Sequence, residues 1–176
     1  MNSNFRTGVW SAGLVAAVAG GCFAIGCLDP LVAVAVIAAG ALSPGRAVLL
    51  VLATWAAGQA VGFGLHDYPR DRQTIAWGFG LGAGALVALA TAVAVLWLLP
   101  RRPAWLRAVA AFSAAFCAQQ AAMLGIEQIV VGWCEVRPAI IAQVGLINAA
   151  WFAGLLAVDA LIARTAPSLP AFGRAP

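Results

Sequence analysis

The chain consists almost entirely of apolar runs that are separated by short polar interruptions. Only 9% of its 176 residues are charged, whereas 64% are hydrophobic. A soluble domain carries roughly 25% charged residues. So few charged side chains cannot cover a water-facing surface, which predicts that the chain folds within a lipid bilayer. The net charge of +4 is small and lies in loops, so it gives no reason to expect a nucleic-acid partner.

Six apolar segments predict an all-α, polytopic membrane helix bundle of six transmembrane helices with a short second helix. The segments are residues 8–27, 30–42, 46–65, 74–99, 104–132 and 138–163. They form a single transmembrane bundle domain over residues 1–165. The proline-bearing stretch 166–176 is predicted to be a cytoplasmic tail.

The second segment is the shortest of the six. Asp29 is expected to be its N-cap and Pro30 its first-turn proline. A helix over 30–42 reaches only about 20 Å, while the hydrocarbon core is about 30 Å thick. The segment therefore either crosses the bilayer as an unusually short transmembrane helix or is a re-entrant helix.

Arginine distribution predicts that both termini are cytoplasmic. All ten basic residues are arginine, a usage typical of a GC-rich bacterial genome, so we expect a bacterial inner membrane. Six spans place seven arginines inside and three outside. If segment 30–42 does not cross, four lie inside and six outside. Because arginine is enriched in cytoplasmic loops, six spans fit better.

Small residues recur at four-residue spacing in the first and fourth segments. The pairs are Ala12 with Ala16, Gly78 with Gly82, and Gly80 with Gly84. Such faces let helix backbones approach closely in lipid. Packing inside the bundle is the commoner use of such a face, and a partner surface is the alternative.

Polar side chains form stripes on three of the predicted helices. Since unpaired polar groups are costly in lipid, they should face the protein interior or a cavity. Two of these stripes run up to an outward loop, which predicts a pocket that opens outward. Interhelical hydrogen bonds that only hold the bundle together are the alternative. The candidate pocket residues are Gln59, Gln120, Glu127 and Asn148.

The loop between the third and fourth segments gathers scarce polar residues. It contains the only histidine, His66, and the only tyrosine, Tyr68. Trp77 and Trp133 lie near the outer ends of their helices, as interfacial tryptophans do. Cys27 and Cys134 also fall near outward loops, where they could form a disulfide or join His66 as metal ligands.

These features resemble the substrate-binding S-components of energy-coupling-factor (ECF) vitamin transporters. The likeness rests on a small six-span bundle, a short second helix, three outward loops and the Ala12–Ala16 face. The resemblance implies that Ala12 and Ala16 dock an ECF transmembrane and ATPase module. It also implies that the outward loops close over a vitamin.

Within that family, the stretch HDYPRDRQTIAWG is most similar to the solitary cobalamin-binding type, BtuM. That type presents an axial cobalt ligand, a cysteine, from this loop. The present chain has His66 there instead, and imidazole also ligates cobalt. The resemblance therefore implies cobalamin as ligand and His66 as its axial metal ligand, without thiolate chemistry.

The expected function is membrane-embedded binding and uptake of a vitamin, with cobalamin as the first candidate and no cofactor of the protein's own. The expected substrate contacts are His66, Tyr68, Gln59, Trp77, Gln120, Glu127, Trp133 and Asn148. A small Cys/His metal-handling membrane protein is one alternative, and a structural subunit of a membrane complex without a ligand is another. An enzyme is not expected, because no nucleophile and base pair is visible.

Overall fold

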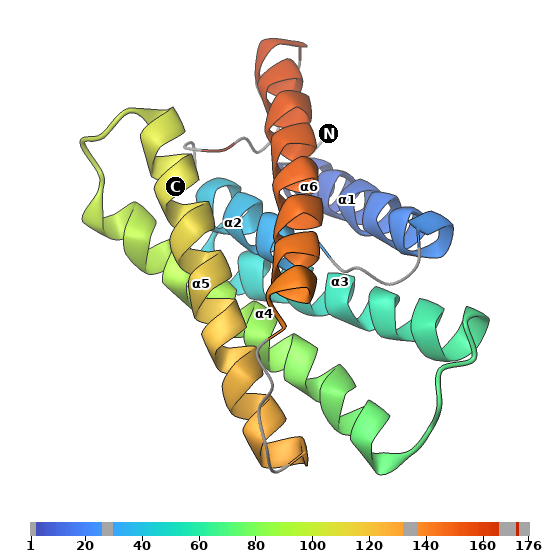
Figure 1. The fold of residues 1–176 in the computed structure, drawn as a ribbon. Coiled ribbons are helices and arrows are strands. Elements are labelled where there is room, and N and C mark those ends of the chain that lie inside the picture. The colour runs from blue at the N-terminus through green and yellow to red at the C-terminus, as the bar shows by residue number, and fades with distance from the viewer. Residues whose placement is uncertain (1–2, 26–29, 132–136, 166–171, 173–176) are drawn as a thin grey trace.

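The computed structural model describes residues 3–25, 30–131, 137–165 and 172, and in this part of the chain it contains helices and no strand (Figure 1). The predicted all-α bundle with a short second helix is confirmed. The helices are α1 (Ser3–Ile25), α2 (Leu31–Ala41), α3 (Pro44–Leu65), α4 (Arg72–Leu98), α5 (Ala104–Val131) and α6 (Pro138–Thr165).

In the part of the chain that the structure describes, four helices are long and apolar enough to cross a membrane, which indicates a membrane-embedded protein. They are Pro44–Leu65, Arg72–Leu98, Ala104–Val130 and Pro138–Leu161. The apolar stretches Thr7–Gly21 of α1 and Leu31–Ala41 of α2 are shorter. Six crossings and cytoplasmic termini remain predictions.

Helix α2 forms the centre of the bundle. Ten of its eleven residues are buried, and it packs against α3, α4, α5 and α6. Figure 1 shows it enclosed by the longer helices. Eleven residues extend only about 16 Å, so α2 cannot span a hydrocarbon core of about 30 Å by its own length. Its sequence, LVAVAVIAAGA, is apolar on every side because every side faces protein.

Helix α4 uses its glycines to approach two neighbours at once. A Cβ on Gly82 would lie 2.9 Å from a Trp55 ring carbon on α3. A Cβ on Gly80 would lie 2.9 Å from Ile126 on α5. Gly78 and Gly84, one turn away on each face, are also buried. The predicted small-residue pairs of this segment therefore serve packing inside the bundle.

We predict opposite effects for two glycine-to-alanine variants. Gly82→Ala should lower the free energy of unfolding by about 1–3 kcal/mol, because its methyl group overpacks against Trp55. Gly125 on α5 is exposed and has nothing within 4 Å of its Cβ position. Gly125→Ala should therefore stabilise by up to about 1 kcal/mol through helix propensity. Denaturation in detergent micelles measures both, and equal effects would contradict this packing.

Candidate functional site

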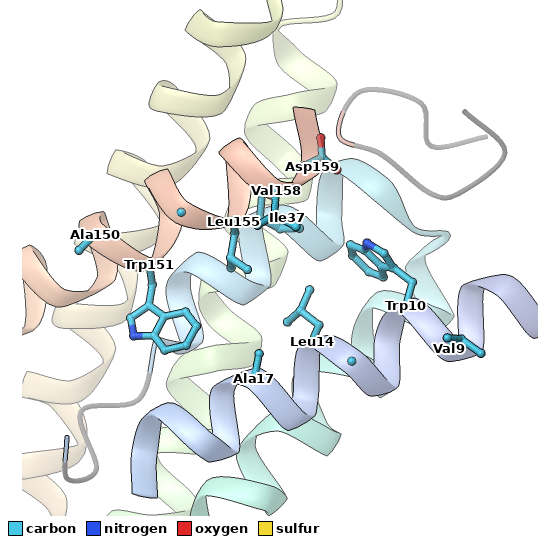
Figure 2. Close-up of a pocket in the computed structure, with 12 residues that line it drawn as sticks. Val9, Trp10, Leu14, Ala17, Ile37, Ala150, Trp151, Leu155, Val158 and Asp159 are labelled. Atoms are coloured by element: carbon cyan, nitrogen blue, oxygen red, sulfur yellow. The ribbon is translucent and has the colours of Figure 1, made fainter. Parts of the chain in front are cut away.

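A groove of about 670 Å³ lies between α1 and α6, with Ile37 of α2 at its base (Figure 2). Figure 2 shows Leu14 of α1 and Leu155 of α6 pointing toward each other across it. Its volume lies within the range of about 300–1,000 Å³ found for small-molecule pockets. The other lining residues are Val9, Trp10, Gly13, Ala17, Ala150, Trp151, Gly154, Val158 and Asp159.

The groove arises because its two walls belong to different helix pairs. Helix α1 packs mainly against α3, whereas α6 packs against α2. Gly13 and Gly154 have no heavy atom within 4 Å of their Cβ positions, so small residues leave the gap open. Toward the C-terminal end of α1, the Trp151 ring lies directly on Gly21, where a Cβ would overlap it. Trp151 therefore joins the two walls at that end.

Asp159 is the acidic residue of the groove lining, and its side chain is only 8% exposed. Both carboxylate oxygens accept from the backbone N–H of Phe172, each at 3.0 Å. The Phe172 ring packs against Gly40 of α2, where a Cβ would overlap it. At Phe172, the predicted tail is therefore in contact with the bundle beside the groove.

Asn148 holds the N-terminus of the central helix. Its Oδ1 accepts from the backbone N–H groups of Val32 and Ala33, at 3.2 and 3.4 Å. Its Nδ2 donates to the Val144 carbonyl oxygen at 3.1 Å. Pro30 occupies the N-cap position of α2 and makes no side-chain cap. The expected N-cap, Asp29, lies outside the described residues. Asn148 belongs to α6, and its side chain accepts the hydrogen bonds that an N-cap side chain would accept.

Gln59 and Trp77 lie on the helices that form the α3–α4 interface, and both are half-buried. Gln59 packs against Gly78, where a Cβ would lie 2.6 Å from its Oε1. One turn earlier, Trp55 Nε1 donates to the Gly78 carbonyl oxygen at 2.8 Å. This part of the polar stripe on α3 thus contacts α4.

Gln120 and Glu127 are half-buried on α5. Neither lines the groove between α1 and α6. Trp133, Cys27 and Cys134 lie outside the described residues. Among those described, no three His, Cys, Asp or Glu side chains gather as metal ligands.

The His66 loop joins α3 to α4 by capping contacts. The His66 N–H donates to Val61 O and ends α3, and Asp71 accepts from Thr74 N at 2.8 Å to begin α4. The exposed His66 ring stacks on Tyr68 with ring centroids 6.2 Å apart. It also lies 6.5 Å from the Phe23 ring of α1.

Neither His66 nor Tyr68 lines the groove. Phe23, beside His66, lies six residues, or about 9 Å along α1, beyond Ala17, which is the nearest α1 residue of the groove lining. Of the predicted site residues that the structure describes, it brings His66 and Tyr68 together, and none of these described residues lines the groove. Ala12 and Ala16 lie on α1 with exposed side chains.

The groove was not predicted from the sequence. Its α1 wall has small residues at four-residue spacing, Gly13 and Ala17, next to the Ala12–Ala16 pair. Its α6 wall has the same four-residue spacing, at Ala150, Gly154 and Val158, which could have identified it. No spacing rule pairs one small-residue face with another, because such a pairing depends on which helices pack together.

No protein-family model, curated protein or solved structure matches this chain.

Replacing Asn148 should destabilise the bundle. Asn148→Ala leaves two amide groups of α2 without their acceptor, so we expect a loss of about 1–2 kcal/mol. Gln143→Ala, at an exposed position of the same helix, is the matched control and should change stability by less than about 0.5 kcal/mol. Equal losses in detergent denaturation would show that the cap contributes nothing.

Asp71 should make stability depend on acid pH. The Thr74 backbone N–H that donates to it is the chief cause that lowers its pKa below the ordinary 3.8. A carboxylate with a lowered folded-state pKa stabilises the protein above the unfolded pKa, and this contribution disappears as pH falls through the folded value.

The difference in thermal midpoint between wild type and Asp71→Ala should therefore be present at pH 7 and shrink below pH 3.8. Asp67→Asn, which removes a carboxylate from the same loop, serves as the control. A difference that stays constant from pH 7 to pH 3 would exclude the capping role of the ionised carboxylate.

Proposed function

We propose that this chain is an integral membrane protein that binds a small, largely apolar organic molecule within the bilayer. We propose further that it acts as the binding subunit of a vitamin-type uptake system. The observation that carries the proposal is the groove between α1 and α6, of about 670 Å³. It has the volume and apolar lining of a small-molecule site, with one carboxylate to orient a ligand.

The chemistry of the groove suits a flat ring system. Trp10 and Trp151 offer aromatic faces, and Leu14, Leu155 and Ile37 offer aliphatic surface. Asp159 can accept a hydrogen bond or pair with a cationic group, in exchange with the Phe172 N–H that it now binds. A ligand with an apolar ring and one polar end fits this arrangement.

Cobalamin is the vitamin to test at the His66 loop, because its proposal rests on the resemblance of that loop and not on the groove. His66 does not line the groove, so binding by the His66 loop and binding by the groove are tested with separate variants. The exposed Ala12–Ala16 face of α1 is the surface that we propose for docking a transport module.

A binding titration with matched variants tests the proposal. Purified protein in detergent is titrated with hydroxocobalamin, riboflavin and thiamine, followed by tryptophan fluorescence and, after desalting, by absorption. Gly154→Leu fills the groove and should weaken binding at least tenfold, while Gly125→Leu, on an exposed face of α5, should not.

The His66→Ala variant distinguishes the groove from the His66 loop as the binding site. Binding that survives His66→Ala but not Gly154→Leu supports the groove. Corrin bands that are lost in His66→Ala and retained in Gly154→Leu would move the site to the loop. Failure of the wild type to bind any of the three vitamins would contradict the proposed function.

A further inference from the structure

The turn between α4 and α5 is the most concentrated positive charge in the chain. Arg101 and Arg102 lie in the turn and are exposed, and Arg107 follows in the first turns of α5. The sequence from Trp97 to Arg107, WLLPRRPAWLR, contains no acidic residue. The segment therefore carries a formal charge of +3 over eleven residues.

Asp71, which caps α4, and Glu127 of α5 lie too far along their helices to neutralise this charge. Asp71 precedes α4, whose 27 residues extend about 40 Å to the turn. Glu127 is twenty residues beyond Arg107 on α5, about 30 Å along the axis. At physiological ionic strength, exposed charges are screened beyond roughly 8 Å.

Arg107 lacks a partner for a buried part of its guanidinium. The side chain is half-buried, and its Nε is buried without any hydrogen-bond acceptor in the described part of the chain. A buried donor without an acceptor costs free energy, and more so when the group is charged. Guanidinium groups bind phosphate oxygens well, because their planar fork of N–H donors matches the phosphate geometry.

Two tryptophans place this turn at the level of lipid headgroups. Trp97 is 85% exposed and Trp105 is 67% exposed, and they lie on either side of the arginine pair in sequence. Exposed tryptophans of membrane proteins concentrate at the boundary between hydrocarbon and headgroups. The three arginines are therefore carried at the depth where lipid phosphates lie.

We propose that the α4–α5 turn binds the headgroup of an anionic phospholipid, with Arg101, Arg102 and Arg107 as the phosphate-binding residues. Trp97 and Trp105 pack against the glycerol and upper acyl region. This inference is independent of the groove and of the proposed vitamin binding. The proposed ligand is a membrane lipid, because the flanking tryptophans provide apolar contact that a free phosphate ion does not use.

Lipid-dependent stability of the purified full-length protein tests this. The thermal midpoint is measured in a neutral detergent with added phosphatidylglycerol or with phosphatidylcholine of the same acyl chains. The wild type should be stabilised by phosphatidylglycerol and little by phosphatidylcholine. Arg101→Gln with Arg102→Gln should weaken the apparent affinity for phosphatidylglycerol about fivefold per arginine, the equivalent of about 1 kcal/mol each.

Arg70→Gln with Arg72→Gln is the matched control. It removes the same charge from the α3–α4 loop and should leave the phosphatidylglycerol effect unchanged. Arg107→Gln is measured separately, so that a folding defect at this half-buried position does not affect the result for the exposed pair. Three outcomes would overturn the proposal: equal stabilisation by both lipids, equal loss in both double variants, or the same stabilisation by inorganic phosphate at matched concentration.

Discussion

The whole bundle depends on keeping the backbone of one short helix away from lipid. Helix α2 is too short to span a bilayer and has no polar face, so it is stable only inside a shell of longer helices. The proline before it provides no side-chain cap, and Asn148 of α6 supplies the acceptor instead. This contact links α2 to α6 and helps set where α6 crosses the bundle.

The position of α6 in turn creates the groove. Helix α6 packs on α2, whereas α1 packs on α3, so a gap remains between α1 and α6. These two helices touch where the Trp151 ring lies on Gly21. The glycines of α4 have the opposite effect, since they close the α3–α4 and α4–α5 interfaces tightly. Small residues thus serve two purposes in one molecule, close packing where a neighbour is present and open space where none is.

Composition and hydrophobic length were sufficient to predict the helical bundle, the six segments and the short second helix. The spacing of Gly78 and Gly82 also predicted a packing face. The site was less predictable, because a polar residue such as Asn148 is the same in sequence whether it faces a ligand or caps a helix. Only the three-dimensional arrangement distinguishes these uses, and here it assigns the Asn148 oxygen to α2.

The contact between Asn148 and α2 also bears on the order in which the bundle is assembled during synthesis. The amide groups of Val32 and Ala33 are synthesised more than a hundred residues before the side chain that accepts from them, as separations of 116 and 115 residues require. Until α6 enters the membrane, the central helix exists without its cap. The core of this protein is therefore complete only once α6 has left the ribosome, and until then the first backbone amides of α2 lack this acceptor.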